Sequence, residues 1–178
     1  MILEESARSN MFRMAKEALT FKQLFDWRDE EAKKWRAFFE QNQQALELPC
    51  GVAQAKDIRE MLLHIFAVDL RYAERLRGED VTAFEAFTNA TAQDLFETGD
   101  RASLLLREYA EGATEEELDQ ELEFTTRTAG TLKASRRKIL IHTVMHGMRH
   151  WAQLASMLRE KGMKTDWQHD YLATRTMP

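Results

Sequence analysis

The sequence predicts an all-α fold, a four-helix bundle, and three features support it. The chain has 178 residues, of which 44% are hydrophobic and 31% charged, which suits one globular domain with an ordinary core. Only two prolines and seven glycines are present, whereas the helix formers Ala, Leu, Glu, Arg and Met are abundant. Four long segments also repeat apolar residues at helical spacing. We therefore expect residues 1–178 to form a single helical-bundle domain.

The first two long helices are predicted on either side of a break. Residues 21–43 carry apolar side chains at helical spacing between charged ones, and residues 6–19 are helix-compatible as a separate turn or as an extension. Residues 46–52 contain Pro49 and a glycine and should end the first helix. A second helix is expected over residues 55–77, with Gly78 as its C-cap.

The second half of the chain predicts two more long helices and an excursion between them. Thr91 and Asp94 resemble a capping box before a helix over residues 92–111. This helix should bury five side chains: Leu95, Phe96, Leu104, Leu105 and Tyr109. A short acidic turn over residues 115–119 then leads to residues 122–132, which are rich in β-formers and predict a small hairpin or an extended loop. Ser135 can cap a last helix that stops at Gly162.

Two further segments have predicted contacts. Arg136, Arg137 and Lys138 open the last helix, where positive charge opposes the helix dipole, so we expect the acidic run at residues 115–123 to lie nearby. The tail carries Trp167 and Tyr171 among polar residues and should pack back on the bundle.

Composition also excludes several classes of function. A net charge of −5 and the lack of a basic stripe argue against nucleic acid as a partner. The N-terminus lacks an apolar signal region, and no run approaches the roughly 18 apolar residues that span a membrane. Cys50 is the only cysteine, which excludes an intrachain disulfide. We expect a cytoplasmic protein without a membrane partner.

A row of histidines is the strongest chemical signal. His142, His146 and His150 stand four residues apart on the last predicted helix, so all three lie in one stripe about 80° wide. Neighbouring members of the row can share one metal ion. His142 and His150 are about 12 Å apart along the helix axis, too far for both to bind one ion with bonds of about 2 Å. One of the three must therefore have another role.

The remaining ligand should come from another helix. His64 lies in the apolar segment M61 L L H I F A V68, where an imidazole without a partner costs free energy. Together with His146 and His150 it would make a three-histidine set that leaves one position open, as in catalytic sites. We expect metal affinity to fall as the pH drops through roughly 6.5, where free imidazole becomes protonated.

Simpler interpretations apply to several of these residues. Each histidine on an apolar face can be a core residue with one hydrogen bond, and Trp151, beside a proposed ligand, can line the pocket or a dimer face. His169 lies in a polar tail and is expected to be a solvated surface residue. No motif near Cys50 suggests a base that would activate it as a nucleophile. Gly147 follows His146 where a zinc peptidase of the HExxH type needs a glutamate.

Two stretches resemble the DinB-like superfamily of metal-binding four-helix bundles. They are D57 I R E M L L H I F A V D L R Y A E R L76 and K138 I L I H T V M H G M R H W A Q L A S M L R E K G162. The first resembles the helix with a single ligand histidine, and the second resembles the helix with two histidines four apart. Trp151 and Ala152 depart from the pattern, because Arg and Gly are usual there.

The resemblance implies a fold, a ligand set and an assembly. His64, His146 and His150 would be the metal ligands, Gln153 would lie beside the site, and His142 would lie in a second layer around it or near the pocket. The implied fold is an up-down-down-up bundle with a long crossover. A homodimer is also implied. We expect zinc or nickel as the ion, although imidazole ligands also suit copper and iron.

Two main hypotheses of function follow, and a third is simpler. The first is an enzyme, a thiol S-transferase or hydrolase, whose metal activates a low-molecular-weight thiol or a water for attack on a small electrophilic substrate. The second is a non-catalytic metal- or ligand-binding module of a stress response. The third is a structural bundle whose histidines only make core hydrogen bonds, and in that case a chelator would leave the melting temperature unchanged.

Overall fold

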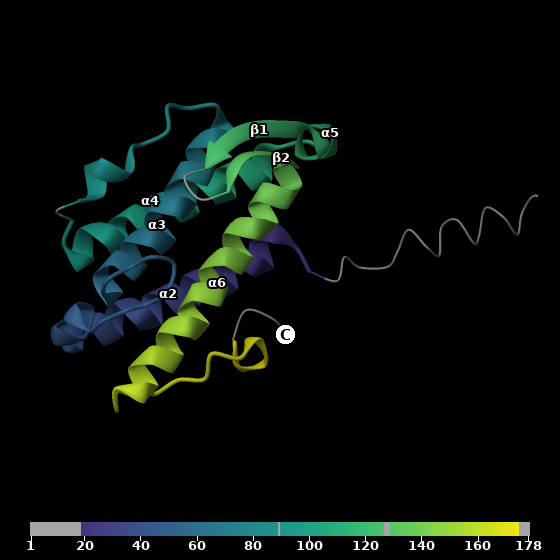
Figure 1. The fold of residues 1–178 in the computed structure, drawn as a ribbon. Helices are drawn as coiled ribbons and strands as arrows, with labels where there is room; N and C mark the ends of the chain where they lie inside the picture. Colours follow the sequence, from purple (N-terminus) through teal and green to yellow (C-terminus); the bar gives the residue numbers. More distant parts are fainter. Residues whose placement is uncertain (1–18, 89, 127–128, 175–178) are drawn as a thin grey trace, which may run out of the picture.

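A computed structural model describes residues 19–88, 90–126 and 129–174, and within these ranges the chain is mostly helical (Figure 1). The long helices are α2 (Phe21–Gln41), α3 (Ile58–Arg77), α4 (Ala92–Gly112) and α6 (Arg136–Glu160). The shorter elements are η1 (Gln43–Glu47), η2 (Phe84–Phe87), α5 (Glu115–Asp119), β1 (Glu121–Thr126), β2 (Gly130–Ser135) and η3 (Tyr171–Ala173). The predicted helix-compatible stretch at residues 6–19 lies outside the described residues except for Leu19.

Side-chain caps fix where the long helices begin. Thr91 and Asp94 form the predicted capping box of α4, and the Ser135 hydroxyl accepts from the backbone N–H of Lys138 at the start of α6. Asp57 caps α3, which therefore begins three residues later than the predicted start at residue 55. Gly78 ends α3 in the left-handed conformation, with φ of 70°.

The four long helices form an up-down-down-up bundle, as predicted. Both α2 and α3 pack against α4 and α6. Helix α3 starts beside η1, at the C-terminal end of α2, so these two helices run in opposite directions. Residues of η1, the first turns of α3 and the first turns of α4 border one hollow, so α3 and α4 start at the same end. The segment between α3 and α4 is therefore a crossover along the bundle (Figure 1).

The predicted excursion before the last helix is a β-hairpin. Strands β1 and β2 pair antiparallel, from Glu121 opposite Ser135 to Thr126 opposite Gly130. Ser135 both ends β2 and caps α6, so the hairpin leads directly into the helix that carries the histidine row. Arg137 pairs with Glu115 and Asp119 of α5, which confirms the expected contact with the acidic run.

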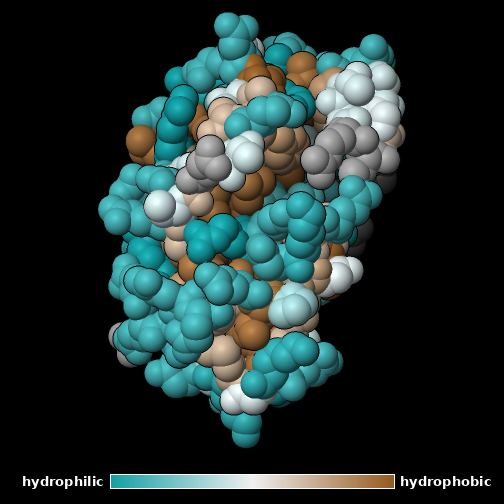
Figure 2. All heavy atoms as spheres, turned by 60° about the vertical axis from the view of Figure 1, so that its left-hand side comes forward, coloured by the Kyte–Doolittle hydropathy of each residue, from teal (hydrophilic) through white to brown (hydrophobic). Residues whose placement is uncertain are grey.

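Aromatic side chains fill the core at the C-terminal half of α6. Trp151 is 2% exposed and stacks on Trp35 of α2, with ring centroids 5.5 Å apart. The expectation that Trp151 lines a pocket or a dimer face is therefore wrong, because the stack buries it. The expectation for Leu104 is also wrong, because this side chain is 57% exposed. Figure 2 shows a largely hydrophilic face with hydrophobic residues in recesses between the polar ones.

The tail packs back on α2, as predicted, through contacts that anchor an acidic side chain. Trp167 donates from its indole N–H to the buried carboxylate of Glu31, at 3.1 Å, and Tyr171 packs edge-on against Trp27. The expectation that His169 is a solvated surface residue is wrong. Its Nδ1 lies 2.5 Å from Glu31 Oε1 and its ring stacks on Trp35. A buried carboxylate needs such partners, and the tail supplies them.

None of the described helices combines the length and the apolar character that crossing a membrane requires.

Candidate metal centre

Packing of α3 on α6 brings together three of the five histidines. His64 comes from α3, and His146 and His150 come from successive turns of α6. His146 Nε2 lies 3.1 Å from His64 Nε2 and 3.2 Å from His150 Nε2. One ring nitrogen from each residue lies within 4.8 Å of the others. The structure thus joins the pair on α6 to the histidine on α3.

Gln153 fixes the orientation of His150. The Gln153 side-chain oxygen lies 2.8 Å from His150 Nδ1. Because a carbonyl oxygen only accepts, this contact places the proton on Nδ1 and leaves the lone pair of Nε2 toward the other two histidines. A hydrogen bond of this kind to the outer nitrogen is typical of metal-binding histidines. Gln153 therefore lies where the resemblance placed it, beside the cluster.

His146 lies at the centre of the cluster, in contact with both other rings, and its pKa is strongly lowered. It is 6% exposed, and its Nδ1 has no hydrogen-bond partner within the described part of the chain. Burial, together with the neighbouring His150 and His64 rings, lowers the pKa of His146 to about 2. Burial also lowers the pKa of His150. Both shifts favour the neutral imidazole that binds a metal, and for His146 they move proton competition to lower pH than the sequence alone suggested.

The donor set fits a divalent cation. His150 Nε2 is an acceptor, and a single proton on His146 Nε2 can serve only one of its two short contacts. A cation between the three nitrogens would satisfy all of them at once, and it would replace the Arg149 guanidinium as the partner of His150 Nε2. Within the described residues, no Cys, Asp or Glu joins this group of candidate ligands, so three histidines could hold the ion and leave a further position open.

His142 lies outside the three-histidine group, which is consistent with the spacing argument that His142 and His150 cannot bind the same ion. Its ring is 5.6 Å from that of His146 and packs edge-on against Tyr72, at 5.4 Å. It lines the same cavity as His64 and His146. His142 therefore lies near the pocket, one of the two places that the resemblance implied for it. Cys50 is buried in the hydrophobic core, and its thiol donates to the backbone oxygen of Val52, at 3.9 Å.

A cavity of about 250 Å³ opens beside the histidines and carries side chains that the sequence analysis missed. Arg71, Arg75 and Arg149 line it together with His64 and His146. The Arg149 guanidinium lies 3.1 Å from His150 Nε2. The signal was present in the sequence, because residues 64, 68, 71 and 75 share one helix face. This shared face does not by itself predict a site, because arginine on an amphipathic helix is usually solvated.

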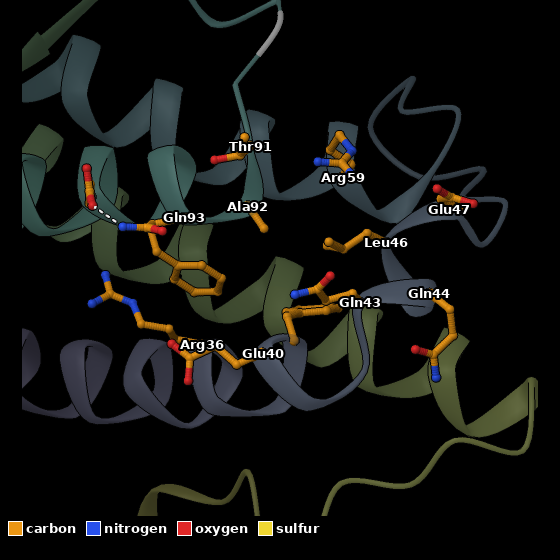
Figure 3. Close-up of a pocket in the computed structure, with 13 residues that line it drawn as sticks. Arg36, Glu40, Gln43, Gln44, Leu46, Glu47, Arg59, Thr91, Ala92 and Gln93 are labelled. Carbon is orange, nitrogen blue, oxygen red and sulfur yellow. Dashed lines mark hydrogen bonds between the residues drawn. The ribbon is translucent and has the colours of Figure 1, made fainter.

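A larger hollow of about 820 Å³ lies elsewhere and has mixed charge (Figure 3). Arg36 of α2, Gln43 and Leu46 of η1 and Arg59 of α3 border it, with Thr91 at the start of α4. It shares no lining residue with the cavity beside the histidines. The chemistry of the donor set, and not cavity size, therefore identifies the candidate site.

Comparisons with known proteins agree with this architecture. The structure is similar to the crystal structure of a DinB-like protein from Bacillus subtilis, with a TM-score of 0.55 and 19% sequence identity over 87% of this chain and 96% of that one. A search of curated proteins found no match. The model of the DinB family matches residues 11–177. With nearly its whole length matched and a DinB-like helical bundle observed, the chain belongs to the DinB family.

Proposed function

We propose that this protein is a metal-dependent enzyme that transfers a low-molecular-weight thiol to a small electrophile or hydrolyses such a molecule. His64, His146 and His150 would bind one divalent cation, with zinc or nickel as the expected ions. Such a cation lowers the pKa of a thiol or water that binds to it and so supplies a nucleophile at neutral pH. The chain's own Cys50 is buried and is not needed for this chemistry.

The convergence of the three ring nitrogens is the observation that carries the proposal. Three protein ligands with a vacant position are the usual arrangement of catalytic sites, whereas structural sites are closed by a fourth protein ligand. The cavity touches two of the three histidines, which gives a small molecule a route to that position. His146 and His150 contribute as neutral donors, and Gln153 orients His150.

Metal binding is tested first, on full-length protein purified without a histidine tag. We expect one zinc or nickel ion per chain by elemental analysis, and we expect the ion to be lost in His146→Gln. His142→Gln is the matched control, because it removes a histidine from the same helix and cavity but not from the triplet. Equal metal content in wild type and His146→Gln would contradict the ligand assignment.

Catalysis is tested separately with metal-loaded protein. We expect conjugation of 2-mercaptoethanol or cysteine to 1-chloro-2,4-dinitrobenzene, or hydrolysis of an activated ester, above the rate of His146→Gln. Stoichiometric metal without either activity would favour the alternative, a non-catalytic metal- or ligand-binding module. A chain that takes up no metal would instead support a structural role for the histidines.

The homodimer implied by the family resemblance stays a prediction. The chain mass is 20.8 kDa, so light scattering during size-exclusion chromatography should give twice this value for a dimer. A mass of one chain at micromolar concentration would contradict it.

A further inference from the structure

The cavity beside the histidines is strongly basic although the chain as a whole is acidic. Arg71, Arg75 and Arg149 line it, and none of the described residues that line it is an aspartate or glutamate. Three positive side chains around about 250 Å³ stand out in a protein with a net charge of −5. Enclosed clefts lined by charge of one sign concentrate ligands of the opposite sign.

The arginines of α3 are held by groups that do not neutralise them. Arg71 donates to the backbone oxygen of Thr82 and lies over the Phe84 ring, while Arg75 donates to backbone oxygens of Arg71 and Thr125, at 3.3 and 3.4 Å. Neither forms an ion pair with a carboxylate in the described ranges. A guanidinium has five N–H donors, so each retains donors for a ligand.

The acid next to these arginines along the helix is engaged elsewhere. The Glu74 carboxylate is 2% exposed and accepts from the backbone N–H and the hydroxyl of Thr82, at 2.8 and 2.6 Å. Burial and the charge of Arg71 lower the pKa of Arg75, although Glu74 opposes this. The positive charge of the cavity is therefore only partly compensated.

The helix geometry places the arginines at a set distance from the candidate metal centre. Residues 64, 68, 71 and 75 form one stripe along α3, with Arg71 about 10 Å and Arg75 about 16 Å along the axis from His64. On α6, Arg149 reaches the cluster itself through His150. A molecule in the cavity can therefore contact an arginine at one end and the histidines at the other.

We propose that this cavity selects a small substrate or thiol that carries an oxyanion, a carboxylate or a phosphate, which Arg71 and Arg75 bind while the reacting group faces the three histidines. The inference rests on the proposed function, because it takes the metal centre as the reacting end. The cavity volume is below the roughly 300–1,000 Å³ of sites for drug-sized ligands, which fits a small metabolite. Planar guanidinium groups match both oxyanions with paired hydrogen bonds.

Anion binding is measured first on metal-free protein, so that it does not depend on the metal. Titration calorimetry with succinate and inorganic phosphate, against neutral succinamide, should show about tenfold tighter binding of at least one anion, as expected for hydrogen bonds to charged groups. Arg75→Gln and Arg71→Gln should abolish the preference, and Arg71→Lys should keep part of it. Arg101→Gln is the control, because it removes an exposed positive charge of α4 outside the cavity. Melting temperatures confirm that each variant is folded.

The next experiment tests whether the arginines favour an anionic thiol at the metal, and it uses cobalt-loaded protein. Mercaptosuccinate should bind about tenfold more tightly than the neutral thiol thioglycerol, as read from the sulfur-to-cobalt charge-transfer band, and Arg75→Gln should weaken only mercaptosuccinate. Equal affinities for the two thiols, or equal losses in the variant, would overturn the anion proposal but leave the metal centre intact. Anion preference in a chain that binds no metal would support the arginine site and contradict the proposed function.

Discussion

At the scale of single residues, the site depends on which nitrogen of each imidazole is available. Gln153 holds the proton of His150 on Nδ1, so its Nε2 faces His146. Among the described residues, His146 has no such partner for its Nδ1, and its neutral state follows from burial among other rings. One histidine is thus oriented by a hydrogen bond, and the other is kept uncharged by its surroundings.

Removing the oxygen of Gln153 should weaken metal binding without removing a ligand. We expect Gln153→Leu to raise the dissociation constant for zinc by about 10- to 100-fold, the usual effect of losing a hydrogen bond to a ligating histidine. Gln153→Glu keeps an acceptor oxygen and should retain affinity. Competition with a chromogenic chelator measures both, and wild-type affinity in Gln153→Leu would show that His150 needs no such support.

The low pKa of His146 predicts how the stability of metal-free protein depends on pH. Between pH about 2 and 6.5 the unfolded chain binds a proton at this residue that the folded chain does not. The free energy of unfolding should therefore fall, by up to about 1.4 kcal/mol for each pH unit below 6.5.

His146→Gln should remove this contribution and flatten the dependence. Urea unfolding at pH 7.5, 6.5 and 5.5 in the presence of a chelator gives the slope for each protein. Because the other titrating groups are common to both proteins, the difference between the slopes reports His146 together with its coupling to the neighbouring histidines. Identical slopes would mean that the folded chain protonates His146 as readily as the unfolded one.

At the scale of elements, α3 and α4 approach closely at one glycine. A Cβ atom added at Gly99 would overlap the Phe66 ring, which is 2% exposed in the core. Helix propensity alone argues against glycine in the middle of a helix. The packing of the two helices therefore explains a residue that the sequence pattern leaves unexplained.

Replacing this glycine should destabilise the protein although it favours the helix. We expect Gly99→Ala to cost about 1–3 kcal/mol through overpacking, offset by about 1 kcal/mol of helix propensity. Gly112→Ala, also in α4, is the control, since a Cβ there meets nothing within 4 Å. Urea unfolding measures both variants, and a Gly99→Ala protein more stable than wild type by about the 1 kcal/mol of helix propensity would show that Phe66 can move aside.

At the scale of the whole molecule, a buried ion pair crosses the bundle between α2 and α3. Arg28 and Asp69 are 4% and at most 1% exposed, and their charged atoms are 2.9 Å apart. Burial raises the pKa of Asp69 to about 6, although Arg28 opposes the shift. The pair stabilises the fold only while both charges are present, because either one alone would be buried without compensation.

Replacing one member of this ion pair should destabilise the protein more than replacing both members. We expect Arg28→Met to cost about 3–5 kcal/mol at pH 7.5, and the double variant Arg28→Met with Asp69→Leu to recover most of that loss. A carboxyl with a raised folded pKa destabilises the protein at high pH, and protonation relieves the cost as the pH falls. The defect of Arg28→Met should therefore shrink at pH 5.5. A pH-independent loss would instead point to altered packing.

Helix positions could be predicted from the sequence, whereas the burial of individual side chains could not. Helical spacing and caps such as Thr91 and Ser135 located the long helices, because both are local properties of the backbone. The pair His146 and His150 followed from helix geometry. Leu104, Trp151 and His169 were misplaced, because burial of a residue depends on which elements cover it.

The sequence by itself determined the all-α class, the order of the long helices and a histidine pair with one further candidate on another helix. These depend on periodicities of a few residues, which the chain carries locally. Only the tertiary structure decided that His64 meets the pair, that Arg71 and Arg75 line the same cavity, and that the tail anchors Glu31. Such contacts join residues up to 138 positions apart. They depend on how whole helices pack, which no local pattern specifies.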